Sequence, residues 1–432
     1  MFFRKNDNFI NTFFMGRVTI LLDQYHSDGV NIYMNTINFD EIKALKKAFS
    51  SVKDRQKKSR PRDFDQKIAR LKAVREASVG NENLLKEAIT NMGKNGIRVF
   101  QAESADDALR VISQEIGNEK LIVKSKSNVT KEIGLSTALK SQGVEVIETD
   151  IGDRILQLLK SKPSHPTGPV AHLSAKTIAE SLSKVYQRTI SDEPEEIVAV
   201  VREELRGYLN KASVGITGAN AITAEEGSIV VAHNEGNIFE VIRRQKYIVM
   251  TAIDKVYPTV EDALNMLKVI CFNATGSLIP SFVEIISGVS KTADVEKKFF
   301  RGVHAPGDIV LILLDNRRRE MIEKGFRELL SCIDCGNCLL HCPMYNTIGT
   351  EFAEEKYLGG KGLAYKSLAD NEVNKKLEFC LTCGRCRKNC PLSIDVPAII
   401  RNIRSDSIPQ EIFYFLKSHL LWLYYNVKLR LS

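Results

Sequence analysis

Eight cysteines towards the C-terminus are spaced as ligands of iron-sulfur clusters would be. Residues 332–343 read C-I-D-C-G-N-C-L-L-H-C-P and residues 380–391 read C-L-T-C-G-R-C-R-K-N-C-P, so both runs have the spacing C-x2-C-x2-C-x3-C-P. Three thiolates this close together can wrap a loop around one corner of a cubane, and a fourth follows on a helical turn, as in bacterial-type [4Fe-4S] proteins. The sequence therefore predicts two [4Fe-4S] clusters, which can pass single electrons.

The two runs are expected to exchange one ligand each. In two-cluster ferredoxins the fourth cysteine of each run binds the cluster of the other run. The first cluster then takes Cys332, Cys335, Cys338 and Cys390. The second cluster takes Cys380, Cys383, Cys386 and Cys342.

Structural zinc and disulfide bonds are the alternatives for so many cysteines. Zinc sites usually draw on two separated pairs of cysteines, and a third cysteine crowded into each run serves a tetrahedral ion poorly. Disulfide frameworks suit small secreted domains, whereas residues 1–33 show neither a continuous apolar core nor a small-residue cleavage site. Thiolate ligands must be kept from oxidation, so we expect a cytoplasmic protein. The ninth cysteine, Cys271, lies in an apolar helical stretch and is expected to be a core residue.

The composition is that of a soluble globular chain of two or three domains. Apolar residues make up 44% of the 432 residues and charged residues 26%, and 61 Lys and Arg against 53 Asp and Glu give a net charge of +8. Basic residues gather at 53–62, but aromatic residues are not interleaved with them as in a nucleic-acid groove. We therefore expect a solvated surface there and no nucleic-acid partner.

The cysteine runs must be positioned by the elements that precede them. Residues 40–91 have a polar, helical pattern, and after Asn95 and Gly96 short apolar strands alternate with helices that open at Ser104 and near Thr130. The predicted strands are 97–100, 121–123, 144–147, 228–232, 247–250 and 308–314. This alternation predicts an α/β fold with an open, mostly parallel sheet and helices on both faces.

We expect four segments in all. An uncertain N-terminal extension with helices occupies 1–60, where Met34 is a candidate translation start, and the α/β domain occupies 61–318. A mainly helical two-cluster ferredoxin domain follows at 319–405, since its linker at 343–379 is far longer than in small ferredoxins and 373–379 has a helical pattern.

A C-terminal amphipathic helix is expected at 406–432. Its apolar part at 412–431 is interrupted by Lys417, Lys428 and Arg430, so the uncharged stretch is too short to span a bilayer. The helix could pack on the cluster domain, dock on a partner subunit or lie in a membrane surface. The last alternative would place a cytoplasmic protein at the inner face of the membrane.

Two polar stretches of the α/β domain could bind a ligand. The strand at 121–123 runs into Lys124, Ser125, Lys126 and Ser127 and then into a helix, and a helix N-terminus beside two lysines is either an anion site or a capped, solvated loop. Asn234 and Asn237 in N-E-G-N at 234–237 could hold a hydroxylated ligand, although a turn accounts for them equally. We treat all six residues as candidate substrate-binding groups.

Other polar residues are weaker candidates. Glu225, in the small-residue stretch 215–227, could act as an acid, base or nucleophile, or it could be a turn residue. His165 and His172 are more often structural than catalytic at such positions. Because no strand is followed by G-x-G-x-x-G and no P-loop occurs, binding of NAD, FAD or ATP is not predicted.

The chain resembles the iron-sulfur subunit of the lactate-utilisation family, in which an α/β domain of the lactate-utilisation type precedes a two-cluster ferredoxin domain. The resemblance rests on both cysteine runs and on K-S-K-S at 124–127, E-T-D at 148–150 with Gly152, K-P-S-H at 162–165, V-G-I-T-G-A-N at 214–220, A-E at 224–225 with Gly227, N-E-G-N at 234–237 and L-D-N at 314–316. Two motifs depart from the family, since A-E-E-G at 224–227 replaces A-E-T-G and D-N-R-R at 315–318 replaces D-N-G-R.

The resemblance implies a fold similar to coenzyme A transferase and ribose-phosphate isomerase. It also implies a complex of three proteins that oxidises L-lactate to pyruvate, in which this subunit carries electrons. The implied partners are a cysteine-rich iron-sulfur protein, similar to glycolate oxidase subunits, and a smaller α/β protein of the same type. A hydroxy acid releases two electrons at once whereas a cluster accepts one, so we expect a two-electron centre, such as a flavin, on a partner.

Two alternative functions stay open. The chain could carry electrons for another donor, as in heterodisulfide-reductase-like or glycolate-oxidase-like assemblies. It could also be a regulatory module that binds a metabolite and uses its clusters for redox sensing. If it transfers electrons, the basic residues Arg385, Arg387 and Lys388 are expected to raise the potential of the second cluster or to dock an acidic redox partner.

Overall fold

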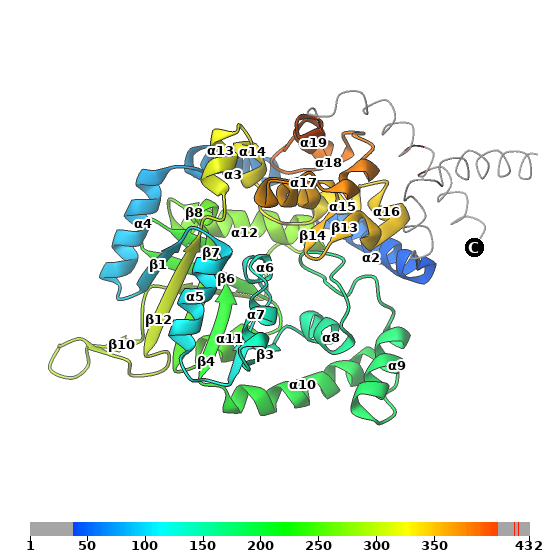
Figure 1. The fold of residues 1–432 in the computed structure, drawn as a ribbon. Coiled ribbons are helices and arrows are strands. Elements are labelled where there is room, and N and C mark those ends of the chain that lie inside the picture. Colours follow the sequence, from blue (N-terminus) through cyan, green and yellow to red (C-terminus); the bar gives the residue numbers. More distant parts are fainter. Residues whose placement is uncertain (1–37, 405–418, 420–421, 423–432) are drawn as a thin grey trace, which may run out of the picture. The chain divides into compact units, whose positions relative to one another are not determined.

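The computed structural model describes residues 38–404, together with 419 and 422 (Figure 1). The predictions for the first 37 residues, including the start at Met34, fall outside these residues, as does the helix predicted at 406–432 apart from residues 419 and 422. The described chain begins with three helices, α2 at Phe39–Ser59, α3 at Phe64–Ser78 and α4 at Glu82–Lys94. The predicted helical pattern of 40–91 is thereby confirmed.

The main sheet has six strands, all parallel, in the order β1-β12-β7-β4-β2-β3. They are β1 Arg98–Ala102, β2 Leu121–Lys124, β3 Glu145–Glu148, β4 Val214–Gly218, β7 Lys246–Ala252 and β12 Asp308–Leu314. The central strands are buried on both faces, which is why β12 reads as a nearly unbroken apolar run. The predicted α/β fold with a mostly parallel sheet is confirmed.

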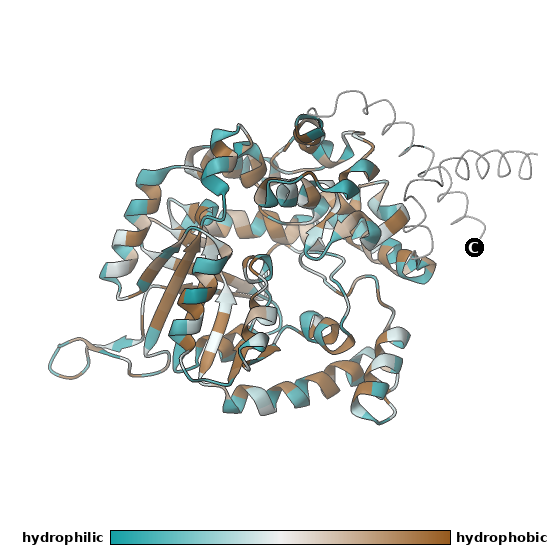
Figure 2. Ribbon diagram, viewed as in Figure 1, coloured by the Kyte–Doolittle hydropathy of each residue, from teal (hydrophilic) through white to brown (hydrophobic). Residues whose placement is uncertain are grey.

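Helices cover both faces of this sheet (Figures 1 and 2). Val310, Ile312 and Leu314 of β12 pack into the layer of α5 Ala105–Ile116, α6 Asn128–Glu132 and α7 Leu135–Ser141. The alternate residues Ile309, Leu311 and Leu313 pack into the opposite layer, which includes α4. Near β2 and β3 that second face is covered by α8 Ile151–Leu159, α9 Ala175–Tyr186 and α10 Pro194–Lys211.

The predicted strand at 228–232 lies outside the parallel sheet. It is β6, Ser228–His233, in a separate four-stranded sheet of order β8-β5-β6-β9. The other strands are β5 Ala221–Thr223, β8 Val256–Tyr257 and β9 Phe282–Ile286, after which β10 Lys291–Thr292 and β11 Phe300–Arg301 form an extended hairpin. Because β6 is buried on both faces, its sequence resembles that of a parallel strand although it pairs antiparallel with β5 and β9.

The strand β4 is missed by sequence analysis, because G-I-T-G at 215–218 resembles a turn. In the structure, a Cβ at Gly215 would lie 2.0 Å from the carbonyl oxygen of Val241 in α11, Asn237–Ile242. A Cβ at Gly218 would lie 2.7 Å from Ser127 Oγ. Both positions therefore require glycine because neighbouring atoms leave no room for a Cβ, and not because the chain turns there.

The cysteine-rich region is mainly helical, as predicted. Its helices are α13 Arg318–Glu323, α14 Arg327–Leu330, α15 Asn337–Leu340, α16 Tyr345–Ile348, α17 Gly359–Asp370, α18 Arg385–Lys388 and α19 Val396–Arg404. The segment predicted to be helical at 373–379 contains a 3-10 helix, η5, at Lys375–Phe379. The region and the α/β domain belong to one compact unit that begins at Asp40.

Among the described residues, no helix combines the length and the apolar character needed to cross a membrane.

Arg317 occupies a backbone conformation that suits glycine, the residue that the resembled family has in D-N-G-R. Its φ is 68° and its ψ 15°, and its guanidinium pairs with Glu320 near the surface. We expect Arg317→Gly to raise the free energy of unfolding by about 0.5 kcal/mol, because relief of the left-handed strain exceeds the cost of glycine's freedom in the unfolded chain. Chemical unfolding would measure it. Arg317→Ala loses the same ion pair but keeps the strained Cβ, so an equal gain from alanine would contradict this explanation.

Candidate functional site

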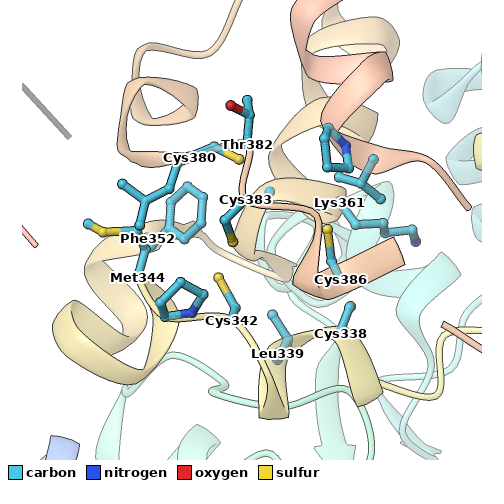
Figure 3. Close-up of a pocket in the computed structure, with 15 residues that line it drawn as sticks. Cys338, Leu339, Cys342, Met344, Phe352, Lys361, Cys380, Thr382, Cys383 and Cys386 are labelled. Atoms are coloured by element: carbon cyan, nitrogen blue, oxygen red, sulfur yellow. The ribbon is translucent and has the colours of Figure 1, made fainter. Parts of the chain in front are cut away.

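The second cysteine run and the end of the first run surround one cavity (Figure 3). The sulfur atoms of Cys342, Cys380, Cys383 and Cys386 lie around this space, and Cys338 contributes to its wall. Apolar side chains such as Met344, Phe352 and Val396 complete the lining. The cavity is thus a thiol-lined, mostly apolar space.

The thiols form two groups that exchange the last cysteine of each run. Burial raises the pKa of the Cys335 thiol, and the nearby Cys332 and Cys390 add to the shift. Burial also raises the pKa of Cys342, and the second-run thiols Cys380, Cys386 and Cys383 add to the shift. Cys390 therefore lies beside the first run and Cys342 beside the second.

The two runs repeat the same backbone. Asp334 and Thr382, each two residues after the first cysteine of its run, have φ of 56° and 46°, and Gly336 and Gly384 both have φ of 74°. The third cysteine of each run then sits on a one-turn helix, α15 or α18. The Asn337 side chain links the runs by donating a hydrogen bond to the Asn389 carbonyl oxygen at 2.6 Å.

This arrangement fits a cubane better than a single metal ion. Within the part of the chain that the structure describes, no group of three or more His, Cys, Asp or Glu side chains converges tightly enough to hold one ion. The thiols of Cys342, Cys380, Cys383 and Cys386 instead stand around the cavity wall, as ligands at the corners of a larger cluster must. The residues present therefore fit a [4Fe-4S] group.

His165 packs directly against the first run. A Cβ at Gly336 would lie 2.2 Å from His165 Nε2, and the other ring nitrogen, Nδ1, lies 3.0 Å from Thr167 Oγ1. Burial lowers the pKa of His165 to about 4, so the ring is neutral at pH 7. His172 is also buried.

Charged side chains from the α/β domain reach the first cysteine loop. Lys255 Nζ donates to the Cys332 carbonyl oxygen at 2.8 Å and lies 3.4 Å from Asp334 Oδ2. Lys361 of α17 contacts the other oxygen of the same carboxylate at 2.7 Å. Arg75 of α3 donates to the carbonyl oxygens of Leu330 and Ser331, directly before Cys332.

A second set of buried ion pairs continues from this loop. Arg318 joins Asp254 at 2.7 Å and Glu132 at 3.0 Å. Glu132 also accepts from Lys356 at 3.0 Å and from the Tyr365 hydroxyl at 3.1 Å. Because these partners come from both parts of the chain, the ion pairs fix the cysteine-rich region on the α/β domain.

A cavity of about 270 Å³ lies between the α/β domain and the first cysteine loop. It brings together five of the candidate substrate-binding residues: Ser125, Lys126, Ser127, Asn234 and Asn237. Ile333 and Asp334 of the first run form part of the same wall, and Met266 and Ile270 of α12, Val260–Thr275, form an apolar side. Cys271 also lines the cavity and is only partly buried.

The polar groups of this cavity are largely paired. Lys126 Nζ lies 3.1 Å from Asp150 Oδ2, whereas the buried Ser125 hydroxyl has no partner among the described residues. Loss of solvent at the cavity wall and the charge of Asp150 raise the pKa of Glu235 to about 7. Glu235 is absent from the sequence-based candidates, although it stands between the two asparagines that they include.

Two candidates lie away from the cavity lining. Lys124 is buried in a two-pronged ion pair with Glu148, at 2.7 and 2.9 Å. Glu225 is exposed, and its backbone carbonyl oxygen accepts a hydrogen bond from Asn91. The next residue, Glu226, stands where the resembled family has threonine, and its carboxylate accepts from the Val260 N–H at the start of α12.

An α/β domain joined to a thiol-rich helical region of this geometry defines an iron-sulfur protein. The model of the LUD domain family matches residues 85–314, and that of the 4Fe-4S dicluster domain matches residues 328–394. The chain belongs to the LUD domain family and carries a 4Fe-4S dicluster domain behind the LUD domain.

Several curated relatives are named Lactate utilization protein B. The one from Exiguobacterium sp. is 33% identical over 289 residues, which cover 66% of this chain and 60% of that protein. The one from Lysinibacillus sphaericus is 34% identical over 64% of this chain and 58% of its own length, and the one from Geobacillus sp. is 29% identical over 84% and 71%. The chain thus spans about 60% of the length of the first relatives.

A crystal structure of a DUF162 family protein from Deinococcus radiodurans is 12% identical and covers 54% of this chain and 97% of its own, with a TM-score of 0.31.

Proposed function

We propose that this chain is an iron-sulfur electron-transfer subunit of a complex that oxidises a 2-hydroxy acid, converting L-lactate to pyruvate. One observation carries the proposal: the last cysteine of each run lies beside the other run, and the loop of the first run forms part of a cavity in the α/β domain. The relatives named Lactate utilization protein B support lactate as the substrate.

The clusters would be held by the crosswise ligand sets. Cys332, Cys335, Cys338 and Cys390 would bind the first cluster, and Cys342, Cys380, Cys383 and Cys386 the second. Each cluster supplies a site that accepts one electron at a time. The domain limits 61–318 and 319–405, and the similarity to the coenzyme A transferase and ribose-phosphate isomerase folds, belong to the same proposal.

The burial of the two sites supports a direction of electron flow. Cys335 of the first run is buried and its neighbours line the α/β cavity, whereas Cys383 of the second run is exposed. Arg385, Arg387 and Lys388 of α18 are exposed beside it. Electrons would enter at the first cluster and leave through the second, where a basic surface suits an acidic redox partner.

The complex must contain further subunits. A two-electron centre, such as a flavin, would stand between the hydroxy acid and the clusters and would belong to a partner. The partners would be a cysteine-rich iron-sulfur subunit and a smaller α/β protein of the same type. Assembly would occur in the cytoplasm, and residues 412–431 would contact the inner face of the membrane.

Anaerobic reduction by lactate tests this function. The native protein is isolated with the subunits that accompany it, its iron and sulfide are measured, and L-lactate is added while the visible cluster absorbance is followed. We expect bleaching by L-lactate but not by glycolate or D-lactate. If every hydroxy acid leaves the colour unchanged while dithionite bleaches it, another electron donor or a redox-sensing role replaces the proposal.

A further inference from the structure

The ion pairs between the α/β domain and the cysteine-rich region are not balanced in charge. Seven contacts link eight side chains into one connected group, which we call the interdomain ion network. It contains five cations, Arg75, Lys255, Arg318, Lys356 and Lys361, and three carboxylates, Glu132, Asp254 and Asp334. The network therefore carries two more positive than negative charges.

An excess of positive charge is energetically unfavourable here, because the interdomain ion network is largely buried. Arg75 is 1% exposed and Arg318 4%, and even Asp334, the most open member, is 34% exposed. A buried net charge is tolerated when an opposite charge stands close by, because the low local dielectric penalises the unpaired charge. The uncharged side chains Tyr365 and Asn316 donate hydrogen bonds to Glu132 and add no negative charge.

The missing negative charge belongs at the first cysteine loop. Cys332 and Cys338 line the same cavity as Lys255, Lys356, Lys361 and Arg318. An oxidised [4Fe-4S] core with four thiolates carries a net charge of about 2−, and the reduced form is about one unit more negative. A cluster at this position would offset the excess of the network.

We propose that the interdomain ion network raises the reduction potential of the first cluster, with Lys255 and Lys361 as the principal positioning residues. This rests on the proposed function, because it requires that the thiols hold a cluster. Reduction adds one electron and no proton to the cluster, so nearby fixed positive charge favours the reduced form. Lys255 and Lys361 act most strongly because both contact Asp334, which lies between two ligands of that cluster.

The network also makes the first cluster site dependent on the α/β domain. Lys255 and Arg75 precede the cysteine-rich region in the sequence, yet one binds the Cys332 carbonyl oxygen and the other the two carbonyl oxygens before it. Among the hydrogen bonds and ion pairs of the described residues, no side chain of the α/β domain binds residues 380–386 in this way. The α/β domain therefore acts on one cluster far more than on the other.

Potentiometric titration of the full chain, monitored by electron paramagnetic resonance of the reduced clusters, tests the proposal. In Lys255→Met and in Lys361→Met, the midpoint potential of one cluster should fall by about 60 mV or more, a tenfold change for a one-electron couple, while the other moves much less. Either substitution leaves Asp334 paired with the remaining lysine and Asp254 paired with Arg75 and Arg318, so no carboxylate loses all its partners.

Two further variants separate charge from disturbance of the fold. Lys366→Met, on the same helix α17, removes a lysine that pairs with Asp370 and Glu354 outside the network, and it should leave both potentials in place. Asp334→Asn removes a negative charge, so it should shift the potential of the same cluster upward. A merely structural disturbance would not shift the midpoint potential in opposite directions when a positive and a negative charge are removed.

The outcomes separate a failure of the charge effect from a failure of the proposed electron-transfer function. The inference would be overturned if both lysine variants left the two cluster potentials unchanged, or lowered the potentials of both clusters equally. The proposed function would still stand. A protein that holds no iron and gives no signal after reduction by dithionite would instead refute the cluster sites themselves.

Discussion

Replacing Gly336 by alanine should prevent assembly of the first cluster. At Gly336 φ is 74°, which an L side chain adopts only at a cost, and the new Cβ would lie 2.2 Å from His165 Nε2 and 2.6 Å from Cε1. The ring is buried and cannot withdraw without moving its neighbours, so overpacking adds to the strain. We expect a loss of about 3 kcal/mol of stability and of about half the iron per chain, measured by chemical unfolding and metal analysis.

The second run supplies the matched control. Gly384 occupies the equivalent position with the same φ of 74°, but a Cβ added there would have no atom within 4 Å. Gly384→Ala therefore isolates the conformational cost, about 1 kcal/mol, and should retain both clusters. His165→Ala in the background of Gly336→Ala should recover part of the iron. Equal losses in the two glycine variants, without rescue, would show that contact with His165 is not the cause.

Pairs of cysteine substitutions should reveal which run serves which cluster. If the ligands are exchanged, Cys332→Ser and Cys390→Ser damage the same cluster, so the double variant should keep about four of the eight iron atoms, as each single variant does. Cys332→Ser combined with Cys342→Ser should damage both clusters and leave almost none. The iron contents of the two double variants should differ strongly, because the first pair damages one cluster and the second pair damages both. The comparison is matched, since the two double variants differ in one position only.

Iron and sulfide analysis of anaerobically purified protein measures this outcome. The single variants at Cys332, Cys342 and Cys390 serve as references for one lost cluster each. Retention of one intact cluster in the Cys332 and Cys342 double variant would mean that each run binds its own cluster, contrary to the grouping of Cys390 with Cys335 in the structure.

The cysteine runs and the parallel sheet could be predicted because their signals are local. Cysteine spacing within twelve residues identifies a cluster loop, and apolar runs such as 308–314 identify buried strands. The strand β4 could not be recognised, because Gly215 is required by contact with Val241, which is far away in the sequence. From neighbouring residues alone, the glycine indicates a turn. The antiparallel pairing of β6 was missed for a related reason, since burial alone does not fix strand direction.

No stretch of the sequence indicates the interdomain ion network. Glu132, Asp254 and Arg318 are far apart in the sequence and belong to no common motif, so only the folded chain brings them together. The candidate ligand residues are an intermediate case. The stretches at 124–127 and 234–237 both reach the cavity, yet Lys124 points into a buried pair with Glu148, which sequence spacing could not reveal.

The two cysteine runs share one backbone conformation but do not tolerate substitution equally. Asp334 and Gly336 correspond to Thr382 and Gly384 in conformation, but the surroundings are unequal. At 384 only the left-handed φ restricts the residue, so asparagine or aspartate could replace glycine at modest cost. At 336 the His165 ring excludes every side chain. Position 384 therefore accepts a few other residues, whereas position 336 requires glycine.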